Sequence, residues 1–323
     1  MSEKPQNLDH PVVGRFYDFD RFAEATRGWD LEFRQLDRGP LSAEVVQVCS
    51  RESVLMRVQF SRALDQLGCS PRGFLTFGFL DDGVSGVRWC GRETNDHSLL
   101  AFDEAGGFDA ISRPGFGGYT YSVTEERLVR VAELLGLPDY HRLSETAKKI
   151  PSGQSSRVVD LRSQARDLCN AMVNDAPQAI KASRLQDELD FELPRRLLSV
   201  IASASGSPRR DSARSRRVAL NKARAFIRDN LDLPLTVRKV CEHTGVSWRT
   251  LDYAFRDSFD MTPQSYLRAV RLDATRRHLR SGSYTTVAEA ANQSGFWHMG
   301  KFAADYRSQF GELPSKTLRR SAR

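Results

Sequence analysis

The chain of 323 residues lacks several features that mark common protein classes. It has no run of about 18 apolar residues, so no membrane-spanning helix and no membrane partner are expected. Its polar start, MSEKPQNLDHP, lacks the apolar core of a secretory signal peptide. The five cysteines form no CxxC pair, which argues against a disulfide framework or a zinc site. These absences predict a cytoplasmic protein with reduced thiols.

The usual signatures of enzymes are missing too. The six histidines are dispersed and form neither an HxH nor an HExxH pattern, so no metal-ligand set is expected. The nucleophile motif GxSxG does not occur, and the glycine cluster at 115–118 stands alone, as in a strand turn. The sequence therefore predicts no catalytic residues, no metal and no cofactor.

Positive charge is concentrated in the last third of the chain. Residues 208–323 carry 23 Lys and Arg against 11 Asp and Glu, a net charge of +12. The other 207 residues carry 25 against 30, a net charge of −5. A basic module on a mildly acidic body is typical of nucleic-acid binding.

The first part of the chain has the pattern of a β-rich domain. Short segments with apolar residues at every second position alternate with turn residues, which predicts a β-sandwich or small barrel. These segments are 31–37, 43–50, 54–61, 73–80, 87–93, 98–106 and 108–123. Helical periodicity begins at Ser122, where Ser122 and Glu125 have the spacing of a capping box. Two more helical patterns follow, at about 158–173 and 180–202.

The chain is therefore expected to be α+β with two domains. Residues 1–202 form an effector or dimerisation domain, a β-rich barrel or sandwich with trailing helices. Residues 203–217 are small, polar and arginine-rich, so they form a linker. Residues 218–323 form an all-α domain, in which Pro263 begins a long helix that ends near Arg280.

The all-α domain contains an internal repeat. The segments 236–263 and 286–314 align on Gly245 and Gly295, and each reads as helix, glycine turn and second helix. This is the helix-turn-helix plan, whose second helix fits the major groove of DNA. The connecting helix has a length of roughly 28 Å, close to the ~34 Å of one turn of B-DNA. The two units are therefore expected to enter successive major grooves.

The second unit carries the most specific resemblance. The segment 295–320, GFWHMGKFAADYRSQFGELPSKTLRR, resembles the second helix-turn-helix unit of the AraC/XylS family of bacterial transcription regulators. The resemblance implies a DNA-binding domain with two such units joined by a long helix. It also implies an activator that binds promoter or operator DNA and RNA polymerase, forms a homodimer, and responds to an unidentified small-molecule effector.

Ten residues at the starts of the two recognition helices are candidates for DNA binding: Ser247, Trp248, Arg249, Asp252, Tyr253, Arg256, Trp297, His298, Met299 and Lys301. Arg249 is expected to bind guanine O6 and N7, and Arg256 a phosphate. The second set is poor in bidentate donors, and we expect Met299 to contribute apolar contact only. No effector-binding residue can be named.

Two alternatives to a sequence-specific regulator stay open. One is a cupin-like β-barrel enzyme with a DNA-targeting tail, for which a metal or ligand cluster should line the barrel. The other is an architectural protein that binds DNA without sequence preference.

Overall fold

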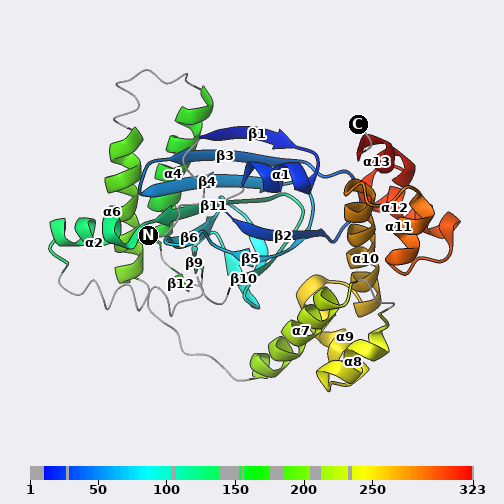
Figure 1. Ribbon diagram of the computed structural model, residues 1–323. Coiled ribbons are helices and arrows are strands. Elements are labelled where there is room, and N and C mark those ends of the chain that lie inside the picture. Colours follow the sequence, from blue (N-terminus) through cyan, green and yellow to red (C-terminus); the bar gives the residue numbers. More distant parts are fainter. Residues whose placement is uncertain are drawn as a thin grey trace. The chain divides into compact units, whose positions relative to one another are not determined.

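The computed structural model describes two compact units (Figure 1). The first comprises Met1–Phe33 and Leu41–Ser207, and the second comprises Arg34–Pro40 and Pro208–Arg323. Within these, the described residues are 11–26, 29–102, 107–137, 153–154, 156–174, 185–203, 212–231 and 235–321.

The twelve strands among the described residues form two antiparallel sheets. The seven-stranded sheet has the order β1 (Val12–Phe16), β3 (Ala43–Cys49), β4 (Ser53–Phe60), β11 (Phe116–Val123), β6 (Leu75–Leu80), β9 (Ser98–Ala101) and β12 (Gly153–Gln154). The five-stranded sheet has the order β2 (Asp30–Gln35), β5 (Leu64–Cys69), β10 (Phe108–Ser112), β7 (Ser85–Trp89) and β8 (Arg92–Asn95). The β-rich fold is thus confirmed, and the described strands form two separate sheets instead of a closed barrel.

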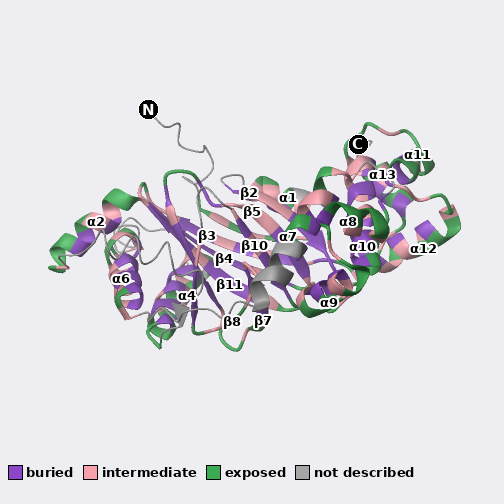
Figure 2. Cartoon of the chain, turned by 90° about the horizontal axis from the view of Figure 1, so that it is seen from below, coloured by how far each residue is buried: buried purple, intermediate pink, exposed green. Residues whose placement is uncertain are grey.

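The seven-stranded sheet buries both of its faces. Side chains of both sheets, with Phe22 of α1 (Phe19–Ala25), form an aromatic core that includes Phe60, Trp89 and Phe108. The other face packs against α2 (Glu125–Leu134), α4 (Val158–Asn174), the π-helical turn η1 (Glu188–Glu192) and α6 (Leu193–Ser203). Figure 2 shows buried residues along β3, β4 and β11 and on α4 and α6. Strand alternation explains this layering, because Tyr119 and Tyr121 belong to the helix-side core while Thr120 between them points the other way.

Several local expectations are corrected. Ser122 belongs to β11, and Thr124 caps α2 by accepting a hydrogen bond from the Arg127 amide. The capping-box spacing was misleading because the strand continues through Ser122 to Val123. Strands β1 and β5 had no clear signal in the sequence. In β5 three buried residues are followed by three half-buried ones, so its burial does not alternate.

The second unit is helical apart from Arg34–Pro40. Its helices are α7 (Ser212–Asp229), α8 (Val237–Thr244), α9 (Trp248–Phe259), α10 (Pro263–Arg280), α11 (Val287–Gln293), α12 (Met299–Phe310) and α13 (Pro314–Ser321). Since α7 begins at Ser212, residues 212–217 of the expected linker are helical, while 204–211 lie outside the described residues. The long helix from Pro263 to Arg280 is confirmed.

The repeat appears as two helix-turn-helix units. Thr236 caps α8, and Gly245 ends it with φ 69°, a left-handed conformation that glycine adopts without strain. Thr286 and Glu289 form a complete capping box at α11, and Gly295 (φ 79°) follows that helix. Each helix-turn-helix unit has an aromatic core. Phe255, Phe259 and Tyr266 pack together in the first helix-turn-helix unit, and Phe302, Tyr306 and Phe310 pack together in the second.

The segment Arg34–Pro40 is held in the second unit by hydrogen bonds to α12. Gln309 Nε2 donates to the Gln35 carbonyl at 2.7 Å, and Gln35 Nε2 donates to the Gln309 carbonyl at 2.8 Å. The Gly39 amide donates to the carbonyls of Ser308 and Gln309. The sequence placed residues 31–37 in a strand of the first domain, whereas the end of that strand belongs to the second unit.

Candidate nucleic-acid interface

The start of α9 presents several of the predicted DNA-binding residues to solvent. Ser247 is the N-cap, and its hydroxyl accepts a hydrogen bond from the Thr250 amide. Trp248 is 59% exposed and Tyr253 52%, and Arg249 is also exposed. Leu251, Phe255 and Phe259 are buried on the opposite side. The helix is therefore anchored through one face and free to contact a ligand through the other.

Two interactions order the exposed side of α9. The Arg249 guanidinium donates to the Tyr253 hydroxyl at 3.2 Å and lies 5.6 Å from the centre of that ring. Arg256 Nε pairs with Asp252 Oδ2 at 2.8 Å. Arg256 remains 57% exposed, whereas the Asp252 side chain is only 14% exposed. Arg249 is thus pre-oriented for a planar acceptor, and Asp252 serves mainly to hold Arg256.

The start of α12 is less uniform. Trp297 is 69% exposed, His298 occupies the N-cap position without a side-chain cap, and Lys301 is exposed. Met299 is half-buried and packs against the core around Phe302, which argues against its predicted contact with DNA. The structure brings the other three together at the beginning of the helix.

Sequence reasoning missed part of the exposed face of α12. Gly300, Ala304 and Arg307 are exposed at spacings of four and three residues, so they share one side of the helix. The buried positions Phe302, Tyr306 and Phe310 already define the opposite side. The helical period of these aromatics was the signal that could have identified the three residues.

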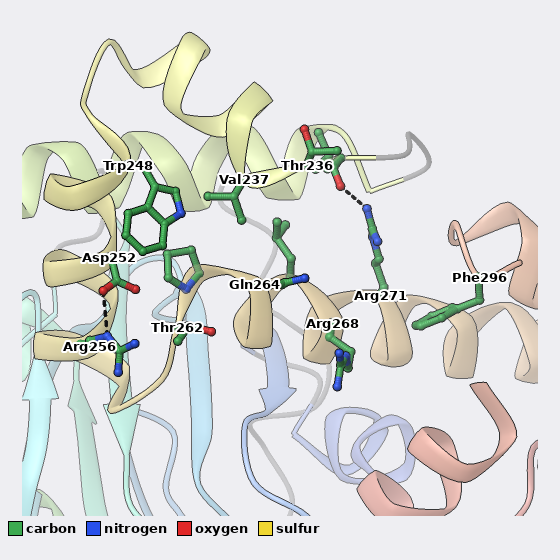
Figure 3. A pocket seen from close by; sticks show the side chains of 13 residues that line it. Thr236, Val237, Trp248, Asp252, Arg256, Thr262, Gln264, Arg268, Arg271 and Phe296 are labelled. Atoms are coloured by element: carbon green, nitrogen blue, oxygen red, sulfur yellow. Dashed lines mark hydrogen bonds and ion pairs between the residues drawn. The ribbon is translucent and has the colours of Figure 1, made fainter. Parts of the chain in front are cut away.

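A groove of about 500 Å³ lies between the first helix-turn-helix unit and α10 (Figure 3). Its lining consists of Leu235, Thr236, Val237, Trp248, Asp252, Arg256, Thr262, Pro263, Gln264, Leu267, Arg268, Arg271 and Phe296. Three arginines and one aspartate make its lining net positive. Figure 3 shows Arg271 reaching from α10 toward the segment before α8, where it donates to the Leu235 carbonyl. Burial lowers the pKa of the Arg271 guanidinium below its usual value.

The first unit contains a smaller cavity in the aromatic core between the two sheets. Its volume is about 60 Å³, and Trp89 and Thr120 are among the residues that line it. The indole Nε1 of Trp89 and the hydroxyl of Thr120 are buried without a hydrogen-bond partner among the described residues. Buried polar atoms are normally paired, so each of these two lacks a partner that a polar ligand atom would supply.

The described part of the chain holds no candidate metal site and no candidate membrane-spanning helix. No group of three or more His, Cys, Asp or Glu side chains there is arranged to hold a metal ion. None of the helices described is both long and apolar enough to span a bilayer.

Two capped helix-turn-helix units in one basic helical unit define the chain as a double helix-turn-helix protein. A family model described as a helix-turn-helix domain matches residues 240–320. The XylDLEGF operon transcriptional activator 3 of Pseudomonas putida is 40% identical over 97 residues, which cover 29% of each chain. Together with the matched motifs, these findings show a helix-turn-helix domain of the AraC/XylS type at residues 240–320.

Two solved structures are also similar. A probable AraC family transcriptional regulator from Rhodopseudomonas palustris is 38% identical, covers 32% of this chain and 96% of its own, and has a TM-score of 0.30. The AraC-like transcriptional activator CuxR is 13% identical, covers 88% of this chain and all of its own, and has a TM-score of 0.44. The chain spans less than a third of the length of the Pseudomonas relative.

Proposed function

We propose that the chain is a sequence-specific DNA-binding regulator of transcription that acts as an activator. The observation that supports this most is the pair of exposed helix starts, at Trp248 of α9 and at Trp297 and His298 before α12, joined by α10 in a unit of net positive charge. At 1.5 Å per residue, the 18 residues of α10 span about 27 Å, which suits successive major grooves. Nine of the ten predicted DNA-binding residues belong to this proposal. Met299 is left out because its side chain is half-buried against the core.

The proposal has further parts. An activator needs RNA polymerase as a partner, and a homodimer would bind paired DNA sites. The chain resembles bacterial regulators, and bacterial DNA lies in the cytoplasm. The proposal therefore includes a cytoplasmic location. The first unit senses an effector and carries no catalysis in this proposal.

The decisive experiment is selection of binding sites from random duplexes by the full chain, followed by footprinting. A sequence-specific regulator is expected to recover one motif and to protect a defined site of roughly 20 base pairs, about two turns of B-DNA. Protection spread evenly along the DNA would indicate the architectural alternative. Enrichment of a stoichiometric metal in the purified protein would instead support the cupin-like enzyme.

The cavity between the sheets is the proposed effector site, and Trp89 provides a specific prediction. Its volume is well below the ~300–1,000 Å³ of typical ligand pockets, so the aromatic side chains must move apart to admit a ligand. A suitable effector has an apolar body and one hydrogen-bond acceptor for the unpartnered Trp89 N–H. Replacing Trp89 by Phe keeps an aromatic ring and removes that donor.

The measurement is a thermal-shift comparison of size-matched aromatics, acetophenone with a carbonyl and ethylbenzene without. We expect the wild-type chain to be stabilised more by acetophenone, since ligands that bind only the folded state raise its melting temperature. In Trp89→Phe the difference should disappear, which corresponds to about 1 kcal/mol for one hydrogen bond. Equal shifts for both compounds in the wild-type chain would reject Trp89 as the anchor.

A further inference from the structure

The groove between α9 and α10 lies beside the predicted base-reading side of α9. Trp248, Asp252 and Arg256 line it and recur every fourth residue, so they form one stripe along α9. Arg249 and Tyr253 each follow a member of this stripe by one residue, so they lie about 100° further around the helix. A duplex that contacts Arg249 and Tyr253 therefore approaches α9 from a side that adjoins the groove.

The other wall of the groove is formed by α10, and its far end lies beside the segment that leads into α12, the second recognition helix. Gln264, Leu267, Arg268 and Arg271 line the groove from one face of α10. Phe296 lines it from the segment that leads through Trp297 and His298 into α12. The groove thus occupies the interval between the two recognition helices, along the helix that joins them.

The charges in the groove differ in their availability. Arg271 is bound to the Leu235 carbonyl, and Arg256 is paired with Asp252 at 2.8 Å. Arg268 has a more distant ion pair, 3.9 Å from Asp305 of α12, and its side chain is 43% exposed. Figure 3 shows the Arg268 side chain extending from α10, and Arg268 lines the groove. Its guanidinium is therefore the group best placed to bind an anion.

We propose that this groove holds the DNA backbone that borders the minor groove between the two occupied major grooves, with Arg268 as its central phosphate ligand. The inference rests on the proposed DNA-binding function. A duplex that places successive major grooves on α9 and α12 turns the intervening minor groove toward α10. The groove lining, with three guanidinium groups and one carboxylate, complements phosphate. Arg271 acts as a positioning residue that ties α10 to the start of the first helix-turn-helix unit.

The test uses Arg268→Gln in the full chain with a duplex selected by the wild-type protein. Glutamine keeps a polar side chain with a similar stem and removes the charge. We expect affinity for the selected site and for random DNA to fall by the same factor, roughly tenfold for a charged hydrogen bond. The slope of log affinity against log salt should become less negative by about 0.9, since one phosphate contact is lost.

Arg277→Ala is the matched control. Arg277 lies nine residues from Arg268 on the same helix, which puts it on the opposite side, and it pairs with Asp273 at 2.8 Å. The Arg277→Ala substitution also removes one positive charge. Because this charge lies on the side of α10 opposite Arg268, the salt slope of the variant should stay at the wild-type value. Arg268→Lys keeps the charge and should retain the slope. Melting temperatures of all variants establish that each is folded.

A second experiment locates the contact: single phosphates between the two major grooves that the protein occupies are replaced, one at a time, by neutral methylphosphonates. The wild-type chain should lose about tenfold in affinity at one of these positions, and Arg268→Gln should lose nothing further there. If Arg268→Gln keeps the wild-type slope, or stays as sensitive as the wild type at every position, the groove inference is wrong. Failure of the wild-type chain to select any site would instead overturn the proposed function.

Discussion

Replacing Phe302 by alanine is expected to unfold the second helix-turn-helix unit. Phe302 is 1% exposed and lies at the centre of the core formed by α10, α11 and α12, with its ring 5.0 Å from Phe296 and 5.7 Å from Tyr306. Removing a buried phenylalanine costs about 3–5 kcal/mol. That is a large part of the ~5–15 kcal/mol that stabilises a typical domain.

Circular dichroism and calorimetric melting of the full chain measure this loss. The melting temperature of the second helix-turn-helix unit should fall by at least about 10 °C, while the β-rich unit keeps its own melting temperature. Lys301→Ala is the matched control because Lys301 is exposed on the same helix, next to Phe302. It should leave both transitions in place. A Phe302→Ala chain that melts like the wild type would show that this core is not formed as described.

Much of the helical part of the chain was predictable because the sequence signals of helices and turns are local. Caps, glycine turns and the helical period act within a few residues, and the turns at Gly245 and Gly295 and the helix from Pro263 to Arg280 appear where expected. The β-rich unit was predictable only as a class. Strand order depends on pairings such as β4 with β11, which join residues about sixty positions apart and leave no local trace.

The parts that escaped prediction depend on contacts between distant segments. The hydrogen bonds between Gln35 and Gln309 join residues 274 positions apart, so no periodicity could assign Arg34–Pro40 to the second unit. Met299 was placed at the DNA because it follows the glycine turn. Its half-buried position against the core depends on the packing of α10, α11 and α12, which the sequence alone does not give.

Arg249→Ala is expected to relax base preference at a single position of the selected site. The Arg249 guanidinium is exposed, and its contact with the Tyr253 ring and hydroxyl limits its freedom before DNA binds. A pre-oriented guanidinium can bind guanine O6 and N7 together, and such a pair discriminates against other bases by about 1–3 kcal/mol. Measured affinities for the four base pairs at that position should therefore converge, while preferences elsewhere stay unchanged.

Arg256→Ala on the same helix provides the contrast. Arg256 lines the groove and stays 57% exposed although it pairs with Asp252, so it is expected to contact phosphate, which carries no base identity. Its loss should weaken selected and random DNA by the same factor and reduce the salt slope by about 0.9. Arg249→Ala should instead narrow the difference between selected and random DNA, because its contact exists only at the selected site. If both variants lose affinity equally on both DNAs, the division between base reading by Arg249 and backbone binding by Arg256 is wrong.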